Sequence, residues 1–382
     1  MPPIYLDFNR TAPMAPSVLA AMEPYWITHA MLPSQQHPAA KAIAEALESS
    51  RERVATLMGC EPFEVIFTSG GTESNNLAIL GRPDIASCES NSGQHILVDP
   101  ACSSAISPVM SQLAQQGFEV ELLPCNADGV IESDAIRSSI RSTTCLCCIA
   151  VASGITGVIQ PVHEIASQCR DAGVSVHLDA VDAAGKLELI ARSLPVDTMS
   201  ISGHKLYGPK GSGALYVRRG TRLQSLMQGE LREMGLRPGS ENVPAWIGLG
   251  VAAMLASHAG NELHGMMDEH IRNLVVGLQA ALPSSQRETI RWIGEDSPRM
   301  PGTAVLDIGM NAGRIQQLCD DLVFSTSDSC DPPDEMARAL FATGMTQESI
   351  PRCMRISTGW TTSSDQIDAA VVSLASAIER CI

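Results

Sequence analysis

The chain has 382 residues, of which 45% are hydrophobic and 18% are charged, so it is not disordered and can form one large globular domain with a smaller one. Its formal net charge of −16 argues against nucleic acid or an anionic membrane surface as a direct partner. The first residues lack the pattern of a signal peptide, no apolar run is long enough to span a bilayer, and the 12 cysteines therefore indicate a reducing, cytoplasmic compartment.

The first two thirds of the chain predict helices followed by alternating strands and helices. Helical periodicity covers residues 17–30 and 38–58, and a β-rich run follows at 64–68. Helices are expected up to about residue 117 and over 163–171, between strands at 95–98, 119–123, 145–151, 174–179, 199–201 and 212–217. This alternation predicts an α/β fold with a doubly wound, mostly parallel sheet.

The rest of the chain predicts a smaller α+β unit. A long helical pattern begins around residues 245–258, and it is followed by strands at 303–308 and 323–327, a helix near 314–322 and a closing helix. We therefore predict a large domain over residues 15–258 and a small domain made of residues 1–14 and 259–382.

Cys145, Cys147 and Cys148 form the densest group of cysteines. They lie in an apolar run from 144 to 152 that predicts a buried strand, and the chain has no paired CxxC motif with zinc spacing. We expect buried thiols here and no metal site.

A glycine pair lies between a strand and a helix. Residues 65–69 are followed by Gly70, Gly71 and Thr72, and a helical pattern then begins. Glycines let the backbone approach an anion, and the free N–H groups and dipole of a helix start favour phosphate, to which the Thr72 hydroxyl adds a donor. An ordinary turn is the alternative interpretation.

Asp179 ends the strand predicted at 174–179. The carboxyl end of a buried strand is where open α/β sheets bind ligands. A carboxylate there can pair with the ring nitrogen of pyridoxal phosphate (PLP), although it can also cap the following turn.

Lys205 follows an apolar strand and lies between glycines, beside Ser202 and His204. Burial favours the neutral amine, which is the nucleophile that forms an imine with an aldehyde such as that of PLP. By itself the segment is also compatible with an ordinary lysine in a turn.

Four segments together resemble one enzyme family: LDFNRTAP at 6–13, SGGTESNN at 69–76, GHKLYGPKG at 203–211 and GLRPGSEN at 235–242. They are similar to segments of the class V aminotransferases, a group of fold-type I PLP enzymes, and above all to cysteine desulfurases of the NifS/IscS kind. The resemblance covers nearly the whole chain.

The resemblance implies a role for each matching residue. Lys205 would hold PLP, Asp179 would face its ring nitrogen, and Arg355, with Asn9 nearby, would bind the carboxylate of the substrate. The phosphate would be bound by Gly71, Thr72, Ser202 and His204. Ser240 would reach the phosphate of the neighbouring subunit, which implies a homodimer.

The resemblance also implies the reaction, in which Cys330 is the decisive residue. In the family a thiolate in this loop attacks the sulfur of PLP-bound L-cysteine, which gives L-alanine and a persulfide for an acceptor protein. Asp328, Asp331 and Asp334 surround the thiol and are expected to raise its pKa. If Cys330 is idle, the alternatives are a C–S lyase, a transaminase or an epimerase, or else a non-catalytic sulfur-relay scaffold.

Three residues depart from the family pattern. Ser103 stands where the family has a histidine that stacks on the PLP ring, Gly154 where it has an asparagine, and Asp182 where it has a glutamine. We still expect Ser103 and Asp182 to contact the cofactor, which would be held more loosely. Asp182 would be either ionised, and so repel a negatively charged phenolic oxygen of PLP, or protonated, and so donate a hydrogen bond to it.

Overall fold

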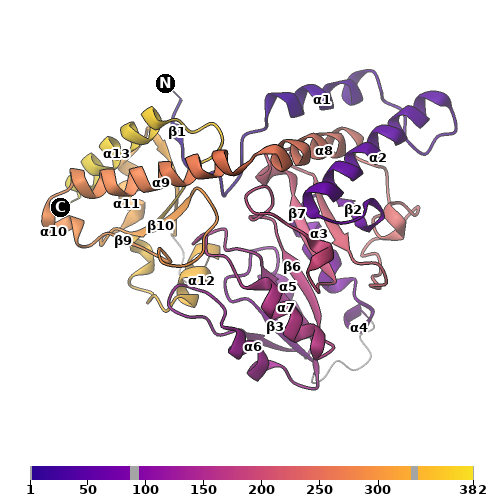
Figure 1. The fold of residues 1–382 in the computed structure, drawn as a ribbon, viewed down its shortest axis with the longest axis horizontal. Coiled ribbons are helices and arrows are strands. Elements are labelled where there is room, and N and C mark those ends of the chain that lie inside the picture. The colour runs from indigo at the N-terminus through magenta and orange to yellow at the C-terminus, as the bar shows by residue number, and fades with distance from the viewer. Residues whose placement is uncertain (1, 87–93, 328–333, 382) are drawn as a thin grey trace.

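The computed structural model describes residues 2–86, 94–327 and 334–381. Its larger part is built around a seven-stranded sheet with the strand order β2-β8-β7-β6-β5-β3-β4 (Figure 1). Strands β3 (His95–Val98), β4 (Glu119–Leu122), β5 (Thr144–Ala150), β6 (Ser175–Asp179) and β7 (Thr198–Ser202) run parallel to one another. Strand β8 (Gly213–Val217) is antiparallel to β7 and to β2 (Val65–Thr68). The predicted α/β fold with a mostly parallel sheet is confirmed.

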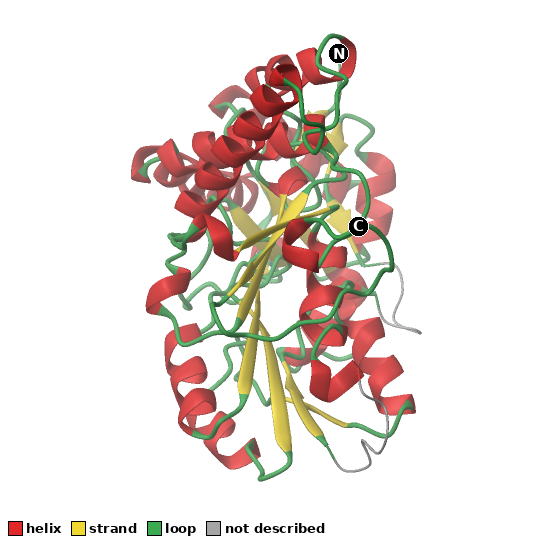
Figure 2. Ribbon diagram, turned by 90° about the vertical axis from the view of Figure 1, so that its right-hand side faces the viewer, coloured by secondary structure: helices red, strands yellow, loops and turns green. Residues whose placement is uncertain are grey.

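Helices cover both faces of this sheet (Figure 2). Strands β2, β3 and β7 are therefore buried along their whole length, whereas the edge strand β4 is partly exposed. The helices of this part are α1 (Pro16–Ile27), α2 (Pro38–Met58), α3 (Gly71–Leu80), α4 (Pro83–Ala86), α5 (Ser107–Gln115), α6 (Ser133–Ser139), α7 (Val162–Asp171) and α8 (Val243–His258). Helix α8 is almost entirely buried and packs against α1 and α2.

The C-terminal part contains two smaller sheets. Strands β12 (Ser325–Thr326), β13 (Cys353–Ser357), β10 (Thr303–Asp307) and β9 (Arg291–Trp292) form an antiparallel sheet in that order. Strand β1 (Ile4–Tyr5) pairs in parallel with β11 (Leu322–Val323), so the N-terminal residues belong spatially to this part. Its helices are α9 (Asn261–Ala281), α10 (Ser284–Arg287), α11 (Ala312–Leu318), α12 (Glu335–Ala342) and α13 (Ser364–Glu379).

Among the described residues, five single-turn 3₁₀ segments connect these elements: η1 (Pro62–Glu64), η2 (Ala191–Ser193), η3 (Gly203–Lys205), η4 (Glu233–Gly235) and η5 (Ile350–Arg352). The strand expected at 323–327 is divided in two, because β11 pairs with β1 whereas β12 pairs with β13. The domain boundary that we predict near residue 258 falls between α8 and α9 and stays a prediction.

The cysteines that the structure describes are free thiols, and Cys147 and Cys148 are fully buried in β5. Among the same residues there is no group of three or more acidic, histidine or cysteine side chains that could hold a metal ion. Within the described ranges no single helix has the length and apolar character needed to cross a membrane, and only α8 and α9 taken together do, across an 83° bend.

Candidate active site

A cavity of about 230 Å³ lies at the carboxyl ends of β6 and β7. Eight of the predicted cofactor-binding residues line it: Gly71, Thr72, Ser103, Asp179, Asp182, Ser202, His204 and Lys205. Larger cavities of about 640 and 790 Å³ lie elsewhere, but they are not lined by Asp179, by Asp182 or by the start of α3. The chemistry is therefore concentrated in the smaller cavity.

The start of α3 forms one wall of the cavity. Gly70 has a φ of +149°, and a Cβ atom on Gly71 would lie only 2.7 Å from Val181 Cγ2, so the close approach of α3 to the turn after β6 requires glycine. The first N–H groups of a helix lack partners within the helix, and here they lie beside Ser202 and His204. This donor set suits a phosphate group.

Asp179 is held by a network of hydrogen bonds. Its Oδ2 accepts from Asn75 Nδ2 at 2.9 Å and from Ser103 Oγ at 2.7 Å. Its Oδ1 accepts from the Val181 N–H at 3.0 Å. Burial raises the pKa of Asp179, and these donors oppose that effect. A buried carboxylate of this kind can accept a proton or a hydrogen bond from a ring nitrogen in the cavity.

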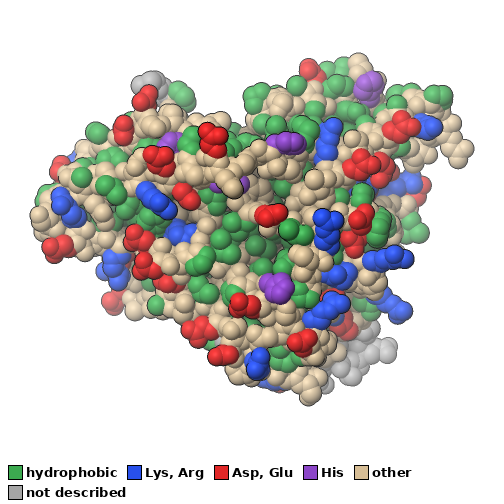
Figure 3. Space-filling view, viewed as in Figure 1, with side chains coloured by type: hydrophobic (Ala, Val, Ile, Leu, Met, Phe, Trp, Pro, Cys, Tyr) green, Lys and Arg blue, Asp and Glu red, His purple; other side chains and the backbone are tan. Residues whose placement is uncertain are grey.

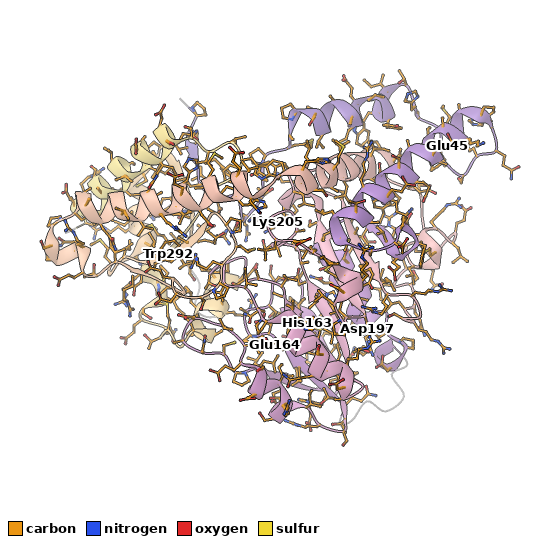
Figure 4. The ribbon with its side chains drawn as sticks, in the orientation of Figure 1. Glu45, His163, Glu164, Asp197, Lys205 and Trp292 are labelled. Atoms are coloured by element: carbon orange, nitrogen blue, oxygen red, sulfur yellow. The ribbon has the colours of Figure 1, made fainter. Side chains whose placement is uncertain are left out.

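Lys205 ends η3, and its side chain is 15% exposed. A Cβ atom on Gly203 would lie 3.0 Å from Pro209 O and would also collide with Ser212 Oγ, so the turn that presents the lysine needs glycine there. Lys205 Nζ donates to the Asn9 carbonyl and to Asp182 Oδ1, the latter at 2.6 Å. Figure 4 shows Lys205 near the centre of the molecule, between the large sheet and the C-terminal elements.

Asp182 lies where a neutral glutamine is expected from the family pattern. Burial by itself raises the pKa of Asp182, but the charge of Lys205 and the hydrogen bond from it outweigh burial, so that the pKa is lowered. Of the two states considered above, the ionised one is therefore favoured.

The predicted substrate-binding residues lie next to this cavity. Arg355 lines a neighbouring cavity of about 340 Å³, and its Nη2 donates to Asp7 Oδ1 at 2.8 Å and to Ser325 Oγ at 3.0 Å. Asn9 is buried, and its Oδ1 accepts from Lys186 Nζ at 2.5 Å. Arg355 Nη1 donates to the Gly154 carbonyl at 3.2 Å, and Arg355 Nε is buried with no partner among the described residues.

The other predicted site residues have different surroundings. His204 lies in the cavity with Nδ1 3.2 Å from Thr11 Oγ1, and burial lowers its pKa to about 4, so that it is neutral at pH 7. Ser240 is exposed and does not line the cavity of its own chain. Cys330 lies outside the described residues. Asp334, which we expected beside the thiol, accepts the Ala337 N–H as the N-cap of α12.

The sequence did not single out four residues that the fold brings to this region. Asn75 orients Asp179, Lys186 contacts Asn9, and Arg10 and Glu335 line both cavities. Asn75 belongs to the glycine-rich segment, and a polar side chain on an otherwise buried helix face was the available signal. Arg10 belongs to the family-like segment at 6–13, whereas nothing in the local sequence of Lys186 or Glu335 marks them.

The donor set fits PLP. A lysine amine, a buried carboxylate and a phosphate-binding helix start share one cavity, and these are the groups that the aldehyde, ring nitrogen and phosphate of that cofactor need.

Comparison with known proteins agrees with this fit. The pattern of the family "Aminotransferase class-V" matches residues 4–369. The chain is 34% identical to cysteine desulfurase IscS of Methylococcus capsulatus, over 99% of this chain and 93% of the relative. It is also 34% identical to the mitochondrial cysteine desulfurase of Drosophila melanogaster, over 99% of this chain and 81% of that protein.

Solved structures show the same fold. A NifS-like protein superposes with a TM-score of 0.89 at 26% identity and covers 99% of this chain and 100% of its own. SspA in complex with cysteine superposes with a TM-score of 0.79 at 27% identity, over 94% of this chain and 99% of its own. By its motifs, its cavity and these relatives, the chain belongs to the class V aminotransferase family, whose members depend on PLP.

Proposed function

We propose that this protein is a PLP-dependent cysteine desulfurase, which converts L-cysteine to L-alanine and passes the sulfur to an acceptor protein. The observation that carries the proposal is the position of Lys205 in one cavity with Asp179 and the start of α3. Relatives about one third identical over nearly the full chain have this activity by name. When bound, PLP supplies an electron sink that weakens bonds at the α-carbon of an amino acid.

The residues of this chain would prepare the site for that chemistry. Asp179, held by Asn75 and Ser103, would keep a proton on the ring nitrogen. Gly71, Thr72, Ser202 and His204 would bind the phosphate, and His204 would do so as a neutral donor because of its lowered pKa. Lys205 would hold the aldehyde carbon and then move a proton at the substrate.

Arg355 and Asn9 would orient the substrate. Cysteine carries a carboxylate that suits the guanidinium fork of Arg355, which lines the cavity next to Lys205. A structure of the relative SspA contains cysteine, which supports cysteine as the amino acid.

Cys330 would receive the sulfur. Its thiolate would attack the sulfur of the substrate and form an S–S bond, the C–S bond would break, and the electron pair would pass to the carbon that becomes the alanine methyl group after protonation. No external oxidant is needed, because the sulfur leaves as a persulfide on Cys330.

A second copy of the chain would complete the site. Ser240 is exposed and outside the cavity of its own chain, so it would serve the phosphate of a partner subunit. Large apolar side chains are exposed near it, at Leu226, Leu231 and Met234, and on α1, at Trp26 and Ile27. Figure 3 shows hydrophobic side chains on the surface over α1 and α2. Such surfaces favour a homodimer, and the free thiols favour a cytoplasmic location.

The test measures L-alanine and sulfide from L-cysteine with dithiothreitol present. We expect equal amounts of both from the wild type, and almost none from Cys330→Ser or Lys205→Ala. Cys381→Ser changes a partly exposed cysteine near the C-terminus and is the matched control, with unchanged turnover expected. Turnover of another amino acid instead, or alanine formation that survives Cys330→Ser, would contradict the proposal and favour a PLP enzyme in which Cys330 is idle.

A further inference from the structure

Gly154 and Asp182 share one space. A Cβ atom on Gly154 would lie 2.5 Å from Asp182 Cγ and closer still to Asp182 Oδ2. No side chain larger than hydrogen therefore fits at 154 while the Asp182 carboxylate keeps its position. The departures from the family pattern at 154 and 182 are thus coupled, because the Asp182 carboxylate occupies the space that a side chain at 154 would need.

The space at 154 lets Asp182 reach Lys205. Its Oδ1 accepts from Lys205 Nζ at 2.6 Å, and both side chains are mostly buried, with exposures of 13% and 15%. An ion pair so far removed from water is screened much less than a surface pair. A carboxylate at 182 thus places a negative charge in contact with the lysine amine, whereas a neutral amide could only donate or accept a hydrogen bond.

Asp182 also faces the other cations of the site. The positive charges of Lys186 and Arg355 lower the pKa of Asp182, as that of Lys205 does. Burial lowers the pKa of Lys186 itself to about 8. Asn9 connects two of these cations, since its carbonyl accepts from Lys205 and its Oδ1 from Lys186. Within the described part of the chain, the ionisable groups that line the cavity of Lys205 or act on its ion pair are Arg10, Asp179, Asp182, Lys186, His204, Glu335 and Arg355.

We propose that Asp182, in the space that Gly154 leaves, is a positioning residue that holds Lys205 as an ammonium ion in the cofactor-free protein and thereby sets the pH at which PLP is captured. This rests on the proposed binding of PLP to Lys205. Capture needs the neutral amine: the ammonium loses its proton to solvent, the amine adds to the aldehyde, and water leaves as the C=N bond forms. Stabilising the ammonium therefore delays capture to higher pH.

The first test measures the rate of PLP capture by the apoprotein between pH 6 and pH 9, from the visible absorbance of the lysine-bound cofactor. For Asp182→Asn we expect a profile displaced to lower pH by about one unit, which means about tenfold faster capture at pH 7. Gly154→Ala changes no ionisable group, yet it displaces the carboxylate and should shift the profile in the same direction. The double variant should shift no further than Asp182→Asn, because both changes act through one contact.

Gly265→Ala is the matched control. An added Cβ atom there meets nothing within 4 Å, so its profile should equal that of the wild type. Identical profiles for the wild type, Asp182→Asn and Gly154→Ala would overturn the proposal. So would additive shifts in the double variant, because they would mean that the two residues act independently.

The second test needs no cofactor. Reductive methylation of the apoprotein, read by mass spectrometry, compares labelling of Lys205 with that of the exposed Lys41, since only the neutral amine reacts. Labelling of Lys205 at pH 7 should rise about tenfold in Asp182→Asn relative to Lys41. If labelling rises but neither the wild type nor any variant captures PLP, the proposed function is wrong and the role of Asp182 stands. If PLP is captured but labelling is unchanged, the role of Asp182 is wrong and the proposed function stands.

Discussion

Lowering the pH is expected to destabilise the protein through His177, which lies in β6 beneath the candidate site. Its Nδ1 lies 2.9 Å from Thr198 Oγ1 and its Nε2 lies 3.0 Å from Asn75 Oδ1. Because Asn75 Nδ2 donates to Asp179, the Asn75 oxygen faces the ring and requires the proton on Nε2. Burial lowers the pKa of His177 from 6.5 to about 3, so the folded protein holds the ring neutral.

The sign and size of this pH effect follow from the difference in proton binding between the unfolded and folded states. Between pH 6.5 and pH 3 the unfolded chain binds a proton at His177 that the folded protein does not, so this contribution is complete above pH 6.5 and is lost as the pH falls. At pH 5 the loss amounts to about 2 kcal/mol of the free energy of unfolding. Burial raises the pKa of Asp99 from 3.8 to about 6, which acts in the opposite sense by about 1 kcal/mol at pH 5.

The assay therefore compares two proteins, so that the contributions of Asp99 and all other groups to the pH dependence cancel. The free energy of unfolding is measured by urea denaturation at pH 8 and pH 5 for the wild type and for His177→Gln, which keeps an amide donor for Asn75. We expect the wild-type value minus the variant value to fall by about 2 kcal/mol between these conditions. If this difference stays constant, the folded protein does not hold His177 neutral, because the ring then takes up its proton equally in the folded and unfolded states.

Two further predictions concern a buried ion pair beside β2 and the start of α3. Glu233 accepts from both Nη atoms of Arg51, at 2.7 and 2.8 Å, with both side chains buried, so Glu233→Ala should lower the free energy of unfolding by about 3–5 kcal/mol. The exposed Glu230→Ala should cost less than about 0.5 kcal/mol, and equal costs in urea denaturation would contradict the buried-pair account. Gly71→Ala places a Cβ atom 2.7 Å from Val181 Cγ2, which should displace the start of α3 and weaken PLP binding at least about tenfold. Unchanged affinity in a spectroscopic titration would mean that this wall does not hold the phosphate.

Much of the main sheet could be predicted because strands such as β2 and β3 are short, apolar and buried along their whole length. The strand at 95–98 is observed with the predicted bounds, and the helix at 38–58 is as well. The region of β11 and β12 could not be predicted, because Leu322 and Ser325 pair with different strands from distant parts of the chain. Local sequence does not encode that division.

Much of the site could be predicted because its motifs lie at one edge of the sheet. The start of α3, the end of β6 and η3 each carry a recognisable segment, so Thr72, Asp179 and Lys205 could be assigned from sequence. The relation between Gly154 and Asp182 could not, since sequence shows two substitutions and not their contact. Nor could Lys186, whose amine reaches Asn9 only in the folded chain.

Peptide mapping after borohydride reduction shows which lysine carries the cofactor, for which we propose Lys205. The protein is loaded with PLP, reduced, digested and read by mass spectrometry. We expect the pyridoxyl group on the peptide that contains Lys205, and its loss in Lys205→Ala. A pyridoxyl group on the nearby buried Lys186, or no reducible adduct in the wild type, would contradict this proposal.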